Sequence, residues 1–365
     1  MGIRPRTSLL NPDLVRPSAL DATPRSHASI WLDKNENLDP ELLRESNFIL
    51  KDLPPLTVAT YPEAGSLYRK IAGWLNLPAE YLILTPGSDG AIRLVFEAFI
   101  DTGDIVVITD PTFAMYSVYS QMFGAKVQKI SYTSKNNSPY LDFERMLSVI
   151  NESHPKLVCL PNPDSPTGTV LSENQFLKLL KTCETNESVL LIDEAYHPFY
   201  KWTALPWIRE SPNLIVARTF AKAWGAAGMR IGYAVAQPST ISILHKLRPM
   251  YEVSTISIEF MDRMIEKVPA MEKSVAKILE GKAYFQQSMR DLGYQVAVTE
   301  GNFVHIRFGE SAEIVQKSLQ GHVLYRGTFG NESLLGFSRF SVGPLEVMEK
   351  VVQLISTAHR NENPK

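Results

Sequence analysis

A lysine and an arginine within one glycine-rich stretch are the residues of this chain with the clearest chemical potential. Lys222 and Arg230 lie in residues 219–233, which read TFAKAWGAAGMRIGY. A lysine amine forms Schiff bases with aldehydes, and its pKa falls readily on burial, while an arginine can hold a phosphate through two parallel hydrogen bonds. The pair therefore predicts a phosphorylated aldehyde cofactor, pyridoxal 5'-phosphate. The segment alone does not exclude a glycine-rich surface loop that carries two unrelated basic residues.

A carboxylate and a phenol follow one of the apolar runs that we predict to be strands. The run 189–192 ends at the sequence DEAY, which contains Asp193 and Tyr196. Ligands of open α/β sheets bind outside the carboxyl ends of the strands. A carboxylate there can keep a pyridine nitrogen protonated, as pyridoxal chemistry requires, and Tyr196 can reach the phenolic oxygen of the ring. The alternative for Asp193 and Glu194 is a solvated helix start, which the preceding apolar run disfavours.

Two further turns follow predicted strands. The run 81–84 is followed by TPGSDG, which begins a predicted helix, and the run 157–160 is followed by the rigid turn PNPDSPTG. The first amides of a helix have no partner inside it, so the N–H groups of Ser88 and Asp89 can bind a phosphate. Taken alone, an ordinary helix N-cap is the better interpretation of Ser88.

The order of the elements predicts an α/β fold in two domains. Between about residues 65 and 236, near-continuous apolar runs alternate with helical patterns, which is typical of a mostly parallel sheet covered by helices on both faces. After Pro238 a long helical region precedes short strands and helices, which predicts a smaller α+β domain. We expect an N-terminal arm and substrate-covering segment at 1–45, a large cofactor domain at 46–250, and a small domain with a long connecting helix at 251–365.

Composition excludes several classes of function. The chain has 365 residues, a net charge of −2 and 44% apolar residues, so nothing favours a nucleic-acid or membrane partner. Cys159 and Cys183 are too few for a disulfide framework, and we see neither a secretory signal nor a membrane-spanning run. No two histidines are spaced as a metal pair, although His197 follows Tyr196 and is expected near the cofactor. We expect a cytoplasmic protein without a metal.

With these segments in place, the chain resembles the fold-type I, class I/II aminotransferases that depend on pyridoxal 5'-phosphate, and within them the histidinol-phosphate aminotransferase branch. The resemblance covers nearly the whole chain from about Leu32. The matching motifs occur in family order with family spacing: LDKNEN from 32, TYPEAG at 60–65, GSD at 87–89, PTFAMY at 111–116, NPxxPTG at 162–168, DEAY at 193–196, the lysine segment, and SRFSVG at 338–343.

The resemblance implies a role for each matching residue in the cofactor site. Lys222 would form the internal aldimine and then move the proton between the substrate carbon and the cofactor. Asp193 would pair with the pyridine nitrogen, and Tyr196 would hydrogen-bond the phenolic oxygen. The remaining cofactor residues implied by the resemblance are Ser88, Asp89, Phe113, Ser165, Thr219 and Arg230; Phe113 would stack on the ring.

The resemblance also implies substrate contacts and a partner. Arg339 would bind the substrate carboxylate, Arg326 would reach the distal group, and Asn35 would lie in the segment that closes over substrate. Tyr61 matches a tyrosine that reaches the cofactor phosphate of the neighbouring subunit, which implies a homodimer. The implied partners are a small-molecule amino donor and a 2-oxo acid acceptor.

Four residues depart from the family pattern. Ser165 stands where an asparagine usually donates to the phenolic oxygen, and Ala221 replaces a phosphate-binding serine beside Lys222. Gly90 replaces a glutamate, and Trp224 replaces a smaller aromatic residue. Losing the asparagine donor should favour the protonated cofactor linkage. We therefore predict that the internal aldimine of Lys222 has a higher pKa than in relatives that keep the asparagine.

The leading hypothesis is an aminotransferase that works by a ping-pong cycle between an amino acid, or an amino alcohol phosphate such as histidinol phosphate, and a 2-oxo acid. A decarboxylase or lyase similar to the threonine-phosphate decarboxylases would use the same lysine, and the motifs barely separate the two. A third hypothesis is a binding or regulatory protein that kept the fold and lost turnover, which Ser165 and Ala221 would motivate.

Overall fold

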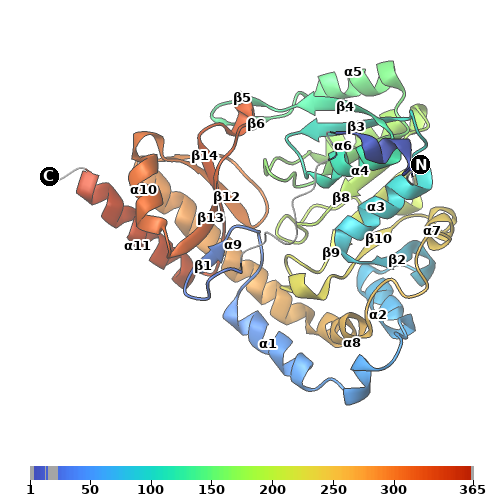
Figure 1. Cartoon of the computed structure of the whole chain (residues 1–365), viewed down its shortest axis with the longest axis horizontal. Helices are drawn as coiled ribbons and strands as arrows, with labels where there is room; N and C mark the ends of the chain where they lie inside the picture. The colour runs from blue at the N-terminus through green and yellow to red at the C-terminus, as the bar shows by residue number, and fades with distance from the viewer. Residues whose placement is uncertain (1–3, 13, 15–23, 363–365) are drawn as a thin grey trace.

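Two sheets, each packed against its own helices, form the part of the chain that the structure describes, which is residues 4–12, 14 and 24–362 of a computed structural model. The larger sheet and its helices lie on the right of Figure 1, and the smaller sheet lies on the left. The long helix α9, Val268–Asp291, runs between the two. Residues 1–3, 13 and 15–23 of the predicted arm lie outside the described residues.

The larger sheet has the order β2-β10-β9-β8-β7-β3-β4, and all of its strands are parallel except β10. The inner strands are apolar throughout because both faces of the sheet are covered. The bounds of its strands are β2 Leu82–Thr85, β3 Ile105–Asp110, β4 Lys126–Ser131, β7 Leu157–Pro161, β8 Val189–Asp193, β9 Leu214–Thr219 and β10 Gly232–Val235.

Helices cover both faces of this sheet, as the alternating pattern predicted. One apolar core lies between the sheet and three helices, α3 Gly87–Phe99, α4 Met115–Phe123 and α7 Pro238–His245. The other core receives α2 Gly65–Leu75, α5 Phe143–Ser153 and α6 Glu173–Thr185. Local signals set the helix ends: Ser172 and Gln175 form a reciprocal capping box at the start of α6.

The smaller sheet has the order β1-β13-β14-β12-β11. Its strands are β1 Ile30–Leu32, β11 Gln295–Val296, β12 Phe303–Arg307, β13 Val323–Thr328 and β14 Phe337–Ser341. The helices α9, α10 Ala312–Leu319 and α11 Leu345–Glu362 pack together beside it. Two more helices, α1 Pro40–Lys51 and α8 Thr255–Met264, pack on each other.

Four strands were missing from the predicted pattern. Strand β4 reads KVQKIS and lies at the sheet edge, so its mostly exposed side chains give no apolar run. A small hairpin joins β5 Thr133–Lys135 to β6 Ser138–Tyr140. Strand β1 pairs in parallel with β13, so the segment predicted as an arm contributes an edge strand to the smaller sheet. No helix within the described residues has the length and apolar character needed to cross a membrane.

Candidate active site

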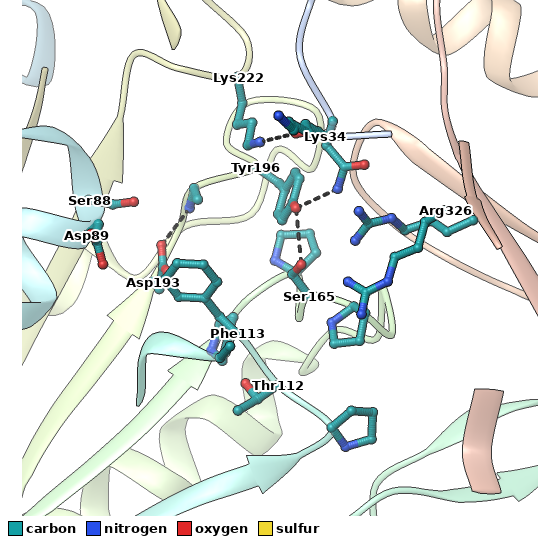
Figure 2. A pocket seen from close by; sticks show the side chains of 18 of the residues that line it. Lys34, Ser88, Asp89, Thr112, Phe113, Ser165, Asp193, Tyr196, Lys222 and Arg326 are labelled. Carbon is teal, nitrogen blue, oxygen red and sulfur yellow. Dashed lines mark hydrogen bonds between the residues drawn. The ribbon is translucent and has the colours of Figure 1, made fainter. Parts of the chain in front are cut away.

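A cavity of about 1050 Å³ lies where the carboxyl ends of β2, β3, β7, β8 and β9 face the smaller sheet. Its walls come from the turns after those strands, from residues 33–35, and from β13 and β14. Figure 2 shows Ser88 and Asp89 on one side and Arg326 on the opposite side. Of the predicted site residues, those that line the cavity are Asn35, Ser88, Asp89, Phe113, Ser165, Asp193, Tyr196, Thr219, Lys222, Arg230, Arg326 and Arg339.

Lys222 projects into this cavity from the loop that joins β9 to β10. Because Thr219 ends β9 and pairs with Gly232 at the start of β10, the loop begins and ends at the same sheet edge. The Lys222 amine is half-buried and donates a hydrogen bond to the carbonyl oxygen of Lys34 at 2.7 Å. Burial, reinforced by the charge of Arg339, lowers the pKa of Lys222 to about 8. About a tenth of the amine is therefore neutral and nucleophilic at pH 7, and about half at pH 8.

Asp193 ends β8 and is only 5% exposed. Its Oδ2 accepts a hydrogen bond from the Tyr116 hydroxyl at 3.2 Å, and its Oδ1 accepts one from the Ala195 N–H at 3.0 Å. Burial raises the pKa of Asp193 to about 6, and the charges of Glu194 and Asp89 add to the rise. Such a carboxylate is suited to receive a cationic N–H group from a ligand.

Tyr196 lies between the N-terminal segment and the turn after β7. Its hydroxyl accepts a hydrogen bond from Asn35 Nδ2 at 2.8 Å and donates one to Ser165 Oγ at 3.2 Å (Figure 2). Asn35 is itself held by Ser341, whose hydroxyl donates to Asn35 Oδ1 at 3.0 Å. The serine that replaces the expected asparagine therefore contacts Tyr196 directly, and Asn35 supports the tyrosine.

The start of α3 forms an anion cradle with Arg230. No described side chain caps this helix, so its first N–H groups, including those of Ser88 and Asp89, remain available. The Arg230 guanidinium lies over the same turn, with Nη2 3.4 Å from the Pro86 carbonyl oxygen. Gly87 has a φ of +77°, and a Cβ there would lie 3.0 Å from Arg230 Nη2, so a side chain at this position would crowd the guanidinium.

The other departures from the family pattern have local explanations. Ala221 lines the cavity without a hydroxyl, and its N–H donates to Thr219 Oγ1 at 3.1 Å. A Cβ on Gly90 would lie 2.6 Å from Pro86 Cδ, so the turn PGSDG has no room for a side chain there. Trp224 points away from the cavity into the core, where its ring contacts Trp74 edge to face.

Two arginines face each other across neighbouring strands on the side of the smaller sheet. Arg326 on β13 is paired in register with Arg339 on β14, a placement in which like charges repel. Arg339 is 7% exposed; its Nη2 donates to the Asp33 carbonyl oxygen at 3.0 Å, and its Nε has no partner among the described residues. Burial lowers the pKa of Arg339. An anion bound between the two would relieve the repulsion.

Two residues singled out in the sequence, Tyr61 and His197, do not line the cavity. Tyr61 does not line this cavity; it is 74% exposed and stacks on Tyr251 with a centroid separation of 4.4 Å. His197, expected near the cofactor, lines a separate groove of about 480 Å³, and burial lowers its pKa to about 3. His197 therefore lines this groove and not the cavity that Tyr196 lines.

Sequence reasoning missed contacts that join distant segments. Three residues that were not predicted belong to the site. Lys34 contacts Lys222, and Tyr116 contacts Asp193. Thr112 lines the cavity. Lys34 acts through its backbone carbonyl, which no side-chain pattern reports. Tyr116 carried a signal, because PTFAMY places it one helical turn after Phe113 at the end of β3.

Comparison with known proteins agrees with this geometry. The family model described as aminotransferase class I and II matches residues 29–355. The chain belongs to this family. A curated histidinol-phosphate aminotransferase from a Thermoanaerobacter species is 30% identical over 325 residues, which cover 88% of this chain and 90% of that protein. This protein is therefore a pyridoxal phosphate-dependent transaminase with the fold-type I architecture.

Solved structures share the fold across most of the chain. The histidinol-phosphate aminotransferase of Sinorhizobium meliloti, solved with pyridoxal 5'-phosphate, has a TM-score of 0.78 at 22% identity, covering 92% of each chain. The L-threonine-O-3-phosphate decarboxylase of Porphyromonas gingivalis has a TM-score of 0.75 at 20% identity, covering 90% of this chain and 98% of that chain. Fold similarity alone therefore does not distinguish amino transfer from decarboxylation.

Proposed function

We propose that this transaminase moves an amino group from a donor with an anionic end, such as histidinol phosphate or an acidic amino acid, to a 2-oxo acid by a ping-pong cycle. The observation that carries the proposal is the placement of Arg326 and Arg339 opposite each other, across one cavity from Lys222. Two guanidinium groups side by side suit a phosphate or a carboxylate, since each can form paired hydrogen bonds.

The residues present fit pyridoxal 5'-phosphate. The uncapped start of α3 and Arg230 suit its phosphate, and the buried carboxylate of Asp193 suits its pyridine nitrogen. Phe113 contributes a ring to the cavity wall, and Tyr196 and Ser165 form a hydroxyl pair for the phenolic oxygen. When bound, the cofactor supplies an electron sink for charge that develops at the substrate carbon.

The chain's own groups then divide the work. The Lys222 amine, once released from the Lys34 carbonyl, serves as the general base and acid that moves a proton at the substrate carbon. The lowered pKa of Lys222 suits that exchange, because a base of pKa near 8 both accepts and returns a proton near neutral pH. Asp193 would keep the pyridine nitrogen of the bound cofactor protonated, and Arg339 would orient the substrate through its anionic group.

We also propose that the chain works as a cytoplasmic homodimer. Exposed apolar side chains gather on α1, on the 3-10 turn Pro55–Val58 and before α8; they are Phe48, Leu56, Val58, Tyr61, Met250 and Tyr251. A cluster of this kind is typical of a protein interface and would place Tyr61 against a second copy. Cys159 and Cys183 are both free and buried, which supports a reducing compartment.

Single turnovers test the amino-transfer proposal. The purified protein is loaded with pyridoxal 5'-phosphate, mixed separately with histidinol phosphate, glutamate, aspartate and alanine, and followed by the absorbance of the cofactor and by the carbonyl product. We expect one equivalent of product from a donor with a distal anion, and an Arg326→Gln variant should react with that donor about tenfold or more slowly while alanine is unaffected. Release of carbon dioxide without a carbonyl product would instead assign a decarboxylase.

A further inference from the structure

His305 connects the substrate side of the cavity to the turn that carries Ser165. It lies on β12, is fully buried, and its Nε2 is 2.6 Å from the carbonyl oxygen of Pro166. His305 does not line the cavity, whereas both Ser165 and Pro166 do. The contact joins the smaller sheet to the turn after β7, two parts of the chain that are far apart in sequence.

The protonation state of this histidine follows from its surroundings. Its ring packs edge to face against Phe303, Phe329 and Phe337 at centroid separations of 5.6, 5.5 and 6.3 Å. Burial, together with the charges of Arg339, Arg326 and Lys282, lowers the pKa of His305 to about 3, so the ring is neutral at physiological pH. A carbonyl oxygen only accepts hydrogen bonds, and the single ring proton must therefore be on Nε2.

The register of the smaller sheet places this histidine beside the two arginines. His305 on β12 is paired with Arg339 on β14, and Arg339 is paired with Arg326 on β13. Residues paired directly across strands share one face of the sheet, so the three form a row that faces the cavity side. One end of the row holds the Pro166 turn, and the middle and other end are placed to hold the substrate anion.

The Pro166 turn has separate supports on its two sides. On the side of the larger sheet, the Asp164 carboxylate accepts hydrogen bonds from the hydroxyl groups of Thr167 and Thr109 at 2.9 and 3.1 Å. On the side of the smaller sheet, the supports are His305 and the N–H of Glu300, which donates to the Gly168 carbonyl oxygen at 2.8 Å. His305 and Asp164 both hold the Pro166–Thr167 peptide, because the Thr167 N–H also donates to Asp164 Oδ1 at 3.3 Å. Of these supports, His305 is the one that lies on a strand paired with the strand of Arg339.

We propose that His305 is a positioning residue that aligns the Ser165 hydroxyl with Tyr196 when the strand of Arg339 engages the substrate anion. The proposal rests on the proposed cofactor and substrate site. A donor on Nε2 fixes the Pro166 carbonyl, and the preceding Ser165 hydroxyl then faces Tyr196 and the phenolic oxygen of the cofactor. Arg339 is paired with His305 from the adjacent strand β14, which links the substrate side to this turn. A serine side chain is shorter than that of asparagine. The distance from the Ser165 hydroxyl to Tyr196 therefore depends closely on where the Pro166 turn is held.

Two variants at one position separate positioning from packing. His305→Phe keeps a ring among three phenylalanine rings and removes the donor, whereas His305→Gln returns an N–H near the place of Nε2. His322, which is exposed and immediately precedes β13, offers a matched control as His322→Phe. Each variant is loaded with pyridoxal 5'-phosphate, the pH titration of its cofactor absorbance is recorded, and KM and kcat are measured for the donor that works best in wild type.

We expect His305→Phe to raise the titration midpoint by about half to one pH unit, because one hydrogen bond is worth about three- to tenfold in proton affinity. KM should rise by a similar factor, while His305→Gln and His322→Phe stay near wild type. The proposal is overturned if the cofactor in His305→Phe titrates as in wild type. It is also overturned if His305→Gln shifts the midpoint and KM as much as His305→Phe does, since that outcome indicates packing alone.

A second measurement does not depend on turnover. In cofactor-free protein labelled with nitrogen-15 histidine, the His305 signal, assigned by its loss in His305→Gln, should show a neutral ring protonated on Nε2 at pH 7. A charged ring or a proton on Nδ1 overturns the proposal. Both readouts remain informative if the single turnovers show no amino transfer, so the failure of one proposal is distinguishable from the failure of the other.

Discussion

Replacing Asp193 by asparagine should stabilise the cofactor-free protein while weakening its hold on the cofactor. The pKa of this carboxyl is raised from 3.8 to about 6 by burial. A carboxyl whose folded-state pKa lies above its unfolded value costs stability as pH rises from about 4 to about 6, and the full cost is present above that window. A pKa shift of about two units lowers the free energy of unfolding by about 3 kcal/mol above pH 6. About half of that loss is already present at pH 5.

An asparagine at this position keeps both observed contacts and removes the charge. Its Oδ1 can still accept from the Ala195 N–H, and its Nδ2 can donate to the Tyr116 hydroxyl. We therefore expect cofactor-free Asp193→Asn to unfold at a temperature about 3–6 °C above wild type at pH 8, with a smaller gain at pH 5. Cofactor affinity should fall by about 100-fold or more, because a buried ion pair loses one partner.

Thermal unfolding of both proteins at pH 5 and pH 8, with and without pyridoxal 5'-phosphate, provides the assay. Asp101→Asn removes the same charge at an exposed position and serves as the control. The reasoning is refuted if cofactor-free Asp193→Asn is no more stable than wild type at pH 8, or if the gain is as large at pH 5. Unchanged cofactor affinity would show that Asp193 does not meet a cationic group.

Three further outcomes follow from the same site. The rate at which cofactor-free protein combines with pyridoxal 5'-phosphate should rise as pH increases through about 8, the pKa of Lys222, in stopped-flow absorbance; a pH-independent rate would contradict a titrating amine. Ser165→Asn should lower the pKa of the bound cofactor by about half to one unit in a spectroscopic titration, since a longer donor reaches the phenolic oxygen. Burial raises the pKa of Asp164 to about 7, so Asp164→Asn should stabilise the protein more at pH 8 than at pH 6 in thermal unfolding, and an equal gain at both would argue against a buried charge.

The part of the site that could be predicted consists of residues whose neighbours in sequence determine their place. Asp193 ends the apolar strand β8, and Lys222 and Arg230 lie in one loop that begins and ends at the same sheet edge. Because parallel strands bring their carboxyl ends to one side, motifs far apart in sequence could be expected to share one cavity. The apolar runs of the inner strands also predicted the alternation of strands and helices along the larger domain, because helices cover both faces of the sheet.

The part that could not be predicted depends on contacts between segments that no local pattern links. The Lys34 carbonyl meets Lys222, and the Asn35 amide meets Tyr196, only because β1 joins the smaller sheet. Strand β1 has three residues, too few for a periodic signal. His305 gave no signal either, because a single histidine in an apolar strand reads as core until its partner, the Pro166 carbonyl, is known.

The pairing of β1 with β13 has a consequence for how the enzyme matures on the ribosome. Residues 30–32 are synthesised long before their partner, residues 323–325. The larger sheet can form while the chain is still growing, since domains tend to fold as units from the N-terminus. Lys34 and Asn35 lie just after β1, so they reach Lys222 and Tyr196 only after β13 has been made. A nascent or C-terminally truncated chain is therefore expected to carry its reactive lysine without the segment that orders it.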